Sequence, residues 1–310
     1  MRTAYGRDVS REIELGLSAV LVGVIEGEHR AVPHVLTLPG PELPTRAFDP
    51  ERHGTLEMSL RDWVESDTGH TLSHVEQLYT FGDRAGGEGA HHVSIGYLAI
   101  VPGRERLKGQ DWRAWAQFFP WEDRREGVPP TLTDLLEPRL RQWANTSNKR
   151  DRLRLSFGLE GHPWRDELVL ERYELLYEAG LVAEYFNDRG QPVPAELAGT
   201  GRPMPRDHRR ILATGIGRLR AKLKYRPVLF ELMRETFTLF ELQSAAEAVS
   251  GQLLHKQNFR RMMMQSGLIE PTGAQTSRRG GRPASEYRFA AEAEWERRVS
   301  PVRFGGARVR

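Results

Sequence analysis

Residues 237–289 read FTLFELQSAAEAVSGQLLHKQNFRRMMMQSGLIEPTGAQTSRRGGRPASEYRF, and this stretch decides the fold of the C-terminal part of the chain. Its first apolar residues recur at helical spacing, and they are Leu239, Leu242, Ala245, Ala246 and Val249. Thr238 is a suitable N-cap for this helix. A turn at 250–252 follows, and a second helix is predicted over Leu254–Gln265, closed by Gly267.

A basic hairpin is predicted directly after the two helices. Leu268–Thr272 and Ser285–Phe289 have the composition of strands, and the loop between them is rich in arginine and glycine. Two helices around a short turn, followed by such a hairpin, are the sequence pattern of a winged helix-turn-helix. We therefore predict this fold for a C-terminal domain at residues 225–310.

The second helix carries side chains suited to DNA recognition. Phe259, Met262 and Met263 share one face, which we expect in the core, and basic and polar residues occupy the other side. Arg and Lys bind guanine, Gln and Asn bind adenine, and the same side chains neutralise phosphates. Wing arginines suit a narrow minor groove or the flanking phosphates. The DNA-binding candidates are Thr238, Lys256, Gln257, Asn258, Arg260, Arg261, Arg278, Arg279 and Arg282.

The charge of the chain is divided unevenly between its two parts. Residues 206–310 contain 21 Lys and Arg against 10 Asp and Glu, whereas residues 1–205 contain 24 against 32. Taken alone, a basic helix face is more often a solvated surface, and an arginine-rich loop is more often an ordinary surface turn. Because both occur in order inside a basic segment, they favour binding to a polyanion such as DNA.

Composition narrows the class of protein further. The chain has 310 residues, 39% hydrophobic and 28% charged, which is typical of two globular domains and excludes collagen-like and largely disordered chains. It contains no cysteine, which excludes disulfides, thiolate metal sites and a thiol nucleophile. The longest apolar run, Leu15–Ile25, is too short for a membrane span and lacks the features of an export signal. We expect a cytoplasmic protein.

The N-terminal 120 residues alternate between strand and turn signals around one helix. A helix fits Thr55–Thr68, because its apolar residues recur at helical spacing and Gly69 is a natural end. Strands are predicted over Leu15–Ile25, Ala31–Leu38, Val75–Phe81 and Val93–Val101. This order indicates an α/β sandwich.

A helical insert and a connecting helix separate the two modules. Within about 120–205 the sequence predicts helices over Thr133–Asn145 and Arg165–Ala179, and no motif in this insert indicates a function. Arg209–Lys224 is a strong amphipathic helix that leads into Tyr225-Arg226-Pro227. Because the proline restricts the residue before it to extended geometry, we expect a stiff joint between the modules.

The segment from Leu36 to Tyr97 resembles the Nudix fold, but its catalytic box is degenerate. Nudix enzymes carry G-x5-E-x7-R-E-U-x-E-E-x-G-U, in which U is apolar and the Glu side chains bind Mg²⁺. With the box anchored on Gly69, Asp67 keeps one of the paired carboxylates and Ser66 replaces the other. Moving the box by one residue recovers Glu65 but loses the glycine. Too few carboxylates remain in either register for tight Mg²⁺ binding.

Five segments carry a closer resemblance, and they are FDPERH (48–53), VEQLYTFGD (75–83), NFRR (258–261), GLIEPTG (267–273) and GRP (281–283). With them the chain resembles the Nudix-related transcriptional regulators of NAD metabolism, a group that includes the NrtR and NadQ families. The resemblance covers about 15–105 and 207–290, with both modules in the order of that group. The long insert is similar to the NadQ side of the group.

The resemblance implies a Nudix pocket that binds a nucleotide such as ADP-ribose, NAD or ATP without cleaving it. By position, the residues that would line this pocket are Arg46, Phe48, Gln77, Tyr79, Phe81, Asp83 and Arg84. Arginine pairs with phosphate through two parallel hydrogen bonds, and aromatic rings stack on adenine. Ordinary strand packing is the alternative for Tyr79 and Phe81, and a solvated turn is the alternative for Arg84.

The sequence therefore predicts an α/β (α+β) Nudix-like sandwich with a helical insert, residues 1–224, followed by the winged helix-turn-helix domain. The expected protein is a homodimeric repressor of genes for NAD biosynthesis or salvage, because helix-turn-helix proteins commonly pair two half-sites. Its partners would be double-stranded operator DNA and a nucleotide effector, with no catalytic residue, metal site or required cofactor. Two alternatives stay open. They are an active Nudix hydrolase with an accessory DNA-binding domain, and a DNA-binding protein whose front half is only a dimerisation scaffold.

Overall fold

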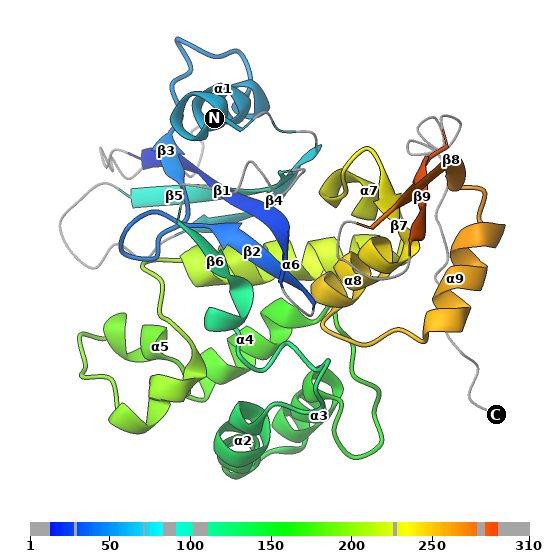
Figure 1. Cartoon of the computed structure of the whole chain (residues 1–310). Coiled ribbons are helices and arrows are strands. Elements are labelled where there is room, and N and C mark those ends of the chain that lie inside the picture. Colours follow the sequence, from blue (N-terminus) through cyan, green and yellow to red (C-terminus); the bar gives the residue numbers. More distant parts are fainter. Residues whose placement is uncertain are drawn as a thin grey trace, which may run out of the picture.

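A mixed β-sheet lies at the centre of the front half (Figure 1). The structure is a computed structural model that describes residues 13–27, 30–70, 72, 74–82, 91–101, 111–225, 228–277 and 283–290. The strands of the sheet are β1 (Ile13–Glu26), β2 (Ala31–Leu36), β3 (Thr45–Ala47), β4 (His74–Gly82), β5 (His91–Ile100) and β6 (Trp112–Ala114). Their order is β4-β5-β1-β2-β6, and β3 pairs with β1 outside this path.

The sheet combines one parallel pair with antiparallel neighbours. β1 runs parallel to β5, while the remaining strand pairs of this sheet are antiparallel. The four strands that the sequence predicts are confirmed, with small differences at their ends. The short strands β3 and β6 are not predicted, because three residues are too few to display an alternating pattern.

Helix α1 (Leu56–Thr68) covers one face of this sheet. Its N-cap is Thr55, whose hydroxyl accepts the Met58 N–H at 3.2 Å, and it ends at Gly69 in the left-handed conformation with φ 68°. Trp63 and Val64 are buried in one cluster with residues of β1 and β5. The predicted helix and its end at Gly69 are confirmed.

Helix α6 (His208–Tyr225) covers the opposite face and completes the sandwich (Figure 1). Ile211, Ile216 and Leu219 are fully buried in a second cluster that also contains Val20 of β1 and Leu98 of β5. Neighbouring residues of a strand point to opposite faces, so β1 supplies side chains to both clusters. The amphipathic helix that the sequence predicts here is confirmed.

The insert is more helical than the sequence predicts. Its elements are η2 (Trp115–Gln117), η3 (Thr131–Leu136), α2 (Glu137–Trp143), α3 (Ser147–Phe157), α4 (Val169–Glu178), α5 (Ala183–Asn187) and η4 (Ala195–Thr200). The single helix expected over Thr133–Asn145 is wrong in detail. It divides into the π-helical turn η3 and α2, because Pro138 has no N–H and Glu137 bonds instead to the Leu132 carbonyl five residues back.

Two further differences in the insert have a physical reason. The helix expected from Arg165 begins only at Val169. The Arg165 carbonyl accepts the Leu168 N–H in a short turn, and the Arg165 and Asp166 carbonyls also accept hydrogen bonds from buried arginines. Helix α3 is not predicted, because its sequence is mostly polar or charged and its buried apolar side chains are only Leu153 and Phe157.

The C-terminal part has the predicted winged helix-turn-helix fold. Its elements are α7 (Leu229–Leu232), β7 (Phe237–Thr238), α8 (Leu239–Ser250), α9 (Lys256–Gln265), β8 (Ile269–Thr276) and β9 (Ala284–Phe289). The three strands form a sheet with the order β7-β9-β8. The strand β7 is not predicted, because with two residues it is too short for a sequence pattern.

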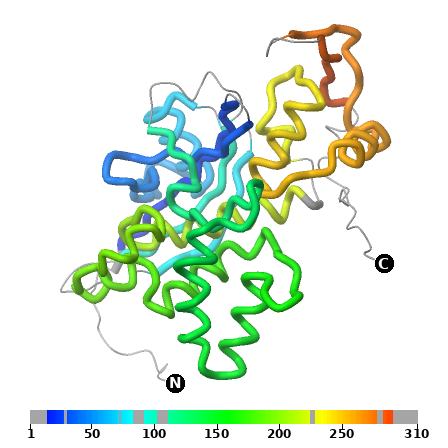
Figure 2. Tube along the Cα trace, turned by 60° about the horizontal axis from the view of Figure 1, so that its bottom comes forward, coloured from blue at the N-terminus to red at the C-terminus, as the bar shows by residue number. Residues whose placement is uncertain are grey.

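One hydrophobic core joins the two halves. The cluster beneath α6 continues through the insert to Leu242 and Val249 of α8. Figure 2 shows the helical insert below the sheet and the winged helix to one side of it. The domain boundary expected after residue 224 stays a prediction. Over the residues that the structure describes, every helix is too short or too polar to cross a membrane.

Candidate nucleic-acid interface

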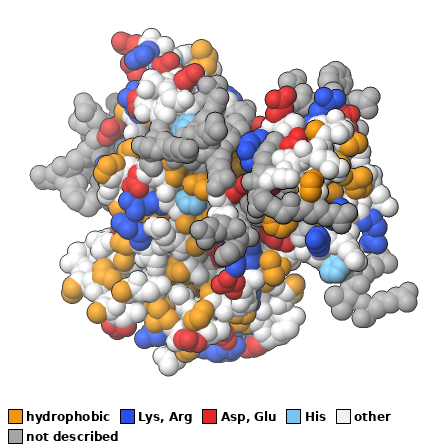
Figure 3. All heavy atoms as spheres, in the orientation of Figure 1, with side chains coloured by type: hydrophobic (Ala, Val, Ile, Leu, Met, Phe, Trp, Pro, Cys, Tyr) orange, Lys and Arg blue, Asp and Glu red, His pale blue; other side chains and the backbone are white. Residues whose placement is uncertain are grey.

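Helix α9 has one buried and one exposed face. Phe259 and Met263 are buried and Met262 packs half-buried against the same core, as the sequence predicts. The helix begins at Lys256, two residues later than expected, because the His255 ring nitrogen Nδ1 caps it by accepting the Asn258 N–H at 3.4 Å. The exposed side carries Lys256, Gln257, Asn258, Arg260 and Arg261. Lys and Arg side chains lie on the outer surface over this helix (Figure 3).

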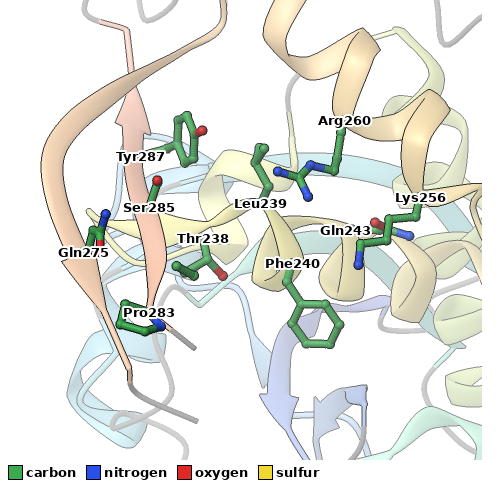
Figure 4. A pocket seen from close by; sticks show the side chains of 11 residues that line it. Thr238, Leu239, Phe240, Gln243, Lys256, Arg260, Gln275, Pro283, Ser285 and Tyr287 are labelled. Atoms are coloured by element: carbon green, nitrogen blue, oxygen red, sulfur yellow. The ribbon is translucent and has the colours of Figure 1, made fainter. Parts of the chain in front are cut away.

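A groove separates α9 from the β8–β9 hairpin. It has a volume of about 720 Å³, and in Figure 4 Lys256 and Arg260 approach it from α9, with Ser285 and Tyr287 on the strand side. The lining residues are Thr238, Leu239, Phe240, Gln243, Lys256, Arg260, Gln275, Pro283, Ala284, Ser285 and Tyr287. The described lining thus holds two cations and no carboxylate, which is an electrostatic environment suited to a polyanion.

The basic side chains of α9 differ in their local contacts. Arg261 donates to the Asn258 side-chain oxygen at 3.3 Å on the same exposed face. Neither Lys256 nor Arg260 forms an ion pair with any residue in the described part of the chain. The charge of these two side chains is therefore available to an anionic partner.

Thr238 lies at the groove but already has a structural role. Its hydroxyl accepts the Glu241 N–H at 3.2 Å, and its own N–H donates to the Glu241 carboxylate at 2.7 Å. This reciprocal pair is a capping box, which fixes the start of α8. The cap that the sequence predicts is confirmed, whereas contact of Thr238 with DNA stays a prediction.

Two glutamines of the groove are not among the predicted site residues. Gln243 donates to the Glu247 side chain at 2.9 Å and to the Leu254 carbonyl at 3.0 Å, so it holds the turn between the helices. Gln275 on β8 is exposed. One sequence feature could have indicated Gln243. It is a polar residue inside the mostly apolar helix 239–249, which suggests that its side chain has a specific partner.

The predicted wing arginines Arg278, Arg279 and Arg282 lie outside the described residues. The same holds for Asp83 and Arg84 of the predicted nucleotide pocket. Their roles stay predictions.

Three of the predicted nucleotide-binding residues lie on the α1 face of the sheet. Arg46 on β3 donates to both carboxylate oxygens of Asp67 at 2.9 and 3.0 Å. Phe48 packs against the cluster beneath α1. Gln77 is exposed and accepts a hydrogen bond from the Tyr97 hydroxyl at 3.3 Å.

The two other described candidates lie toward α6, on the opposite face. Phe81 packs half-buried against the cluster beneath α6. Tyr79 is 54% exposed, and its ring centroid lies 6.0 Å from the Arg218 guanidinium of α6. The structure therefore divides the predicted pocket residues between two faces, so they do not line one cavity together.

Three of the four carboxylates of α1, those of Glu57, Asp62 and Asp67, have an arginine partner. Asp67 binds Arg46, and Glu57 accepts from Arg61 of the same helix at 2.9 Å. Asp62 lies 3.4 Å from Arg52 and 3.1 Å from the ring nitrogen of His53. Within the ranges that the structure describes, no three His, Cys, Asp or Glu side chains are grouped to hold a metal ion.

Comparisons with known proteins show what the C-terminal domain is similar to. Residues 229–289 match the family model of the NrtR DNA-binding winged helix domain. The ADPR responsive transcriptional repressor NtrR of Acinetobacter baylyi is 42% identical over 86 residues, which is 28% of this chain and 34% of that relative. The match thus spans about a third of the length of this curated relative.

Two solved structures share the overall fold. Shewanella oneidensis NrtR complexed with a 27mer DNA has a TM-score of 0.54 and 18% identity, covering 93% of this chain and 99% of that one. Shewanella oneidensis NrtR by itself has a TM-score of 0.53 and 18% identity, covering 93% and 97%. Residues 229–289 therefore match the NrtR DNA-binding winged helix domain, in a chain whose overall fold is similar to these two NrtR structures.

Proposed function

We propose that this protein is a transcriptional repressor that binds operator DNA with α9 and the wing. The observation that carries the proposal is the groove between them, where Lys256 and Arg260 have no acidic partner among the described residues. Support comes from the 42% identity with a repressor and from the fold shared with an NrtR that binds a 27mer DNA.

The repressor would act as a homodimer in the cytoplasm. Helix-turn-helix dimers place their reading helices in two half-sites that are one helical turn or more apart. The target genes follow from the resemblance to regulators of NAD metabolism, and we propose genes of NAD biosynthesis or salvage. A stable monomer in light scattering, both alone and on DNA, would contradict the dimer.

The effector that we propose is ADP-ribose, ahead of NAD and ATP. The repressor from Acinetobacter baylyi is described as ADPR responsive, which supports this order. We place the nucleotide on the α1 face, near Arg46, Phe48 and Gln77. These three side chains lie on the same face of the sheet, and an arginine and an aromatic ring are suited to a diphosphate and an adenine.

Binding without hydrolysis is the proposed fate of the nucleotide. A Nudix hydrolase needs carboxylates that converge on Mg²⁺, whereas Glu57, Asp62 and Asp67 of α1 each pair with an arginine. This pairing supports a sensor over the alternative of an active hydrolase.

The test is a mobility-shift assay on the DNA upstream of the protein's own gene, with and without ADP-ribose, NAD or ATP. We expect a specific complex whose affinity changes with ADP-ribose. Incubation of the same nucleotides with Mg²⁺ or Mn²⁺ tests the hydrolase, and rapid cleavage would overturn the sensor. Calorimetry tests the scaffold alternative, because a scaffold binds no nucleotide.

A further inference from the structure

The front half contacts α8 at two separate points. The Ala31 N–H of β2 donates to the Ser244 hydroxyl in the middle of α8 at 3.0 Å, and this bond is buried. The Arg124 N–H donates to the Gly251 carbonyl, directly after α8, at 2.8 Å. Two such contacts along one helix fix its direction as well as its position.

The segment Glu122–Arg125 links these two points. Arg124 binds the turn after α8, and the buried Arg125 side chain donates to the Ala31 carbonyl at 2.8 Å. Arg125 is itself held by Asp123, with a closest nitrogen–oxygen distance of 2.7 Å. One short segment therefore holds both the turn and the strand that contacts Ser244.

Buried charges anchor this segment to the core. The Glu122 carboxylate is 1% exposed and accepts from the Arg172 guanidinium of α4 at 2.6 and 2.8 Å. It also pairs with Arg220 of α6. Burial opposes ionisation of Glu122, but the two guanidinium groups outweigh it and hold the pKa of this carboxyl below its ordinary value.

Arg220 extends the anchor to the reading domain. Its Nε donates to the Val249 carbonyl at the end of α8 at 2.9 Å, and it donates to the Asp166 carbonyl at 3.0 Å. The guanidinium is fully buried and planar, so it joins α6, Glu122 and α8 in one fixed geometry.

Gly251 shows how closely the turn fits against this segment. Its φ is +68°, and a Cβ added there would lie 2.5 Å from the Glu122 carbonyl oxygen and 3.0 Å from the Arg220 side chain. Gly267, after α9, has a similar φ of +69° but open space around it. The two glycines thus share a backbone conformation and differ in their surroundings.

We propose that Glu122–Arg125 and Arg220, which we name the turn bracket, are positioning residues for DNA reading. The turn bracket holds α8, and through the short turn also α9, at a fixed orientation to the sensor sheet. The inference rests on the proposed function, because orientation matters only when two reading helices engage two half-sites. It assigns this role to the insert, from which the sequence predicts no function.

A direct test compares Gly251→Ala with Gly267→Ala. Both substitutions introduce left-handed strain, but only the first displaces the turn from the turn bracket. The chain has no cysteine, so Met58→Cys on α1 and Met264→Cys on α9, both exposed in the structure, allow spin labels to report one distance. The labelled protein is mixed with an excess of unlabelled protein, so that most dimers carry labels on one protomer only. The measured distance is then the one within a protomer.

We expect a narrow distance distribution in the labelled parent and in Gly267→Ala, and a broad or shifted one in Gly251→Ala. Arg220→Lys is the second variant, because lysine keeps the charge but cannot bridge Val249 and Glu122. It is expected to broaden the distribution even if Gly251→Ala fails to fold. Narrow, unshifted distributions in the folded variants would overturn the proposal.

The DNA measurement separates this proposal from the proposed function. Gly251→Ala is expected to lower affinity for the upstream operator about tenfold, comparable to the loss of one base contact, while affinity for random DNA stays within about twofold. If distances broaden but the parent protein does not bind the operator specifically, the repressor function fails and the turn bracket stands. If the parent protein binds the operator and Gly251→Ala leaves both distance and affinity unchanged, the turn bracket fails.

Discussion

The surface of α1 and the groove beside α9 use arginine in opposite ways. On α1 and the segment before it, Arg46, Arg52 and Arg61 each pair with a carboxylate. In the groove, Lys256 and Arg260 have no acidic partner among the described residues. A paired guanidinium contributes little net field, whereas unpaired cations in a concave site attract a polyanion. Pairing, and not the number of arginines, therefore distinguishes the two surfaces.

Buried arginines are a third way in which the molecule uses this residue. They change how the excess of Lys and Arg over Asp and Glu in residues 206–310 is interpreted. Arg209 and Arg220 belong to the basic segment 206–310, yet both are fully buried and paired with Glu184 and Glu122. The pair of Arg209 and Glu184 has no net charge, and Glu122, which Arg220 shares with Arg172, offsets part of the charge of Arg220. The basic excess of this segment therefore overstates the positive charge that DNA would meet.

The largest effect is expected in the groove beside α9, where the cations have no acidic partner among the described residues. Arg260→Ala should lower specific affinity for operator DNA by about 1–3 kcal/mol if its contact is to a base, and Arg261→Ala is expected to act in the same range. Fluorescence anisotropy at fixed salt measures this loss.

The matched control for Arg260 is Arg288→Ala in the same domain. Arg288 on β9 is exposed and pairs with Glu270 at 2.6 Å, so its charge is already neutralised. We expect operator affinity within about twofold of the parent, as for most exposed ion pairs. Equal losses at Arg260 and Arg288 would break the comparison between paired and unpaired arginines.

A second prediction concerns Arg46, whose guanidinium pairs with Asp67 of α1. Arg46→Ala should lower ADP-ribose affinity about tenfold, because a charge-assisted contact to the diphosphate is lost. Asp67→Asn should raise that affinity, since it frees Arg46 from its partner. Calorimetry measures both variants.

Arg52→Ala is the control for Arg46, because its guanidinium also pairs with an α1 carboxylate. We expect unchanged nucleotide binding in this variant. If Arg46→Ala also binds ADP-ribose like the parent protein, the nucleotide lies elsewhere and the α1 face is the wrong site.

The third prediction concerns the wing. Arg279→Ala or Arg282→Ala should weaken binding to all DNA sequences alike and lower the slope of log affinity against log salt by about one, as expected for a phosphate contact. Titrations on operator and random DNA at several salt concentrations measure the slope. A loss confined to the operator, at unchanged slope, would indicate base contacts. Unchanged affinity in these variants and in both α9 variants would mean that the DNA-reading surface is wrongly placed.

The winged helix was predictable because its signals are local. Thr238 caps α8, Gly251 ends it, and the apolar spacing of 239–249 matches one helix face. The turn bracket was not predictable for the opposite reason. Glu122 and Arg220 lie 98 residues apart, and neither position differs from an ordinary surface charge in the sequence.

The described residues that were predicted for the nucleotide pocket lie on two faces of the sheet because of an irregularity in β4. In a regular strand, residues 77, 79 and 81 share a face. The pairing of β4 with β5 shifts register between Gln77 and Thr80, so Tyr79 and Phe81 lie toward α6 while Gln77 lies toward α1. A bulge of this kind leaves no reliable signal in a single sequence.

The stiff joint expected at Tyr225-Arg226-Pro227 stays a prediction, because residues 226 and 227 lie outside the described ranges. The contacts of the turn bracket provide a second connection between the halves that does not depend on that joint. An effector changes DNA affinity only through its different affinities for two arrangements, and both connections are able to transmit such a difference.

The smallest effect on DNA binding is expected at Thr238, a neutral residue of the groove. Its hydroxyl already accepts the Glu241 N–H, so Thr238→Ala should cost about 1 kcal/mol of unfolding free energy, as for a lost N-cap, while Thr238→Ser keeps the cap. Operator affinity of the folded protein should stay within about twofold in both variants, because the charged groups of the groove are unchanged. Thermal unfolding and anisotropy separate the two quantities. A tenfold loss of affinity in Thr238→Ala that serine restores would show that the hydroxyl also contacts DNA, and the groove would then depend on a neutral donor as well as on its unpaired cations.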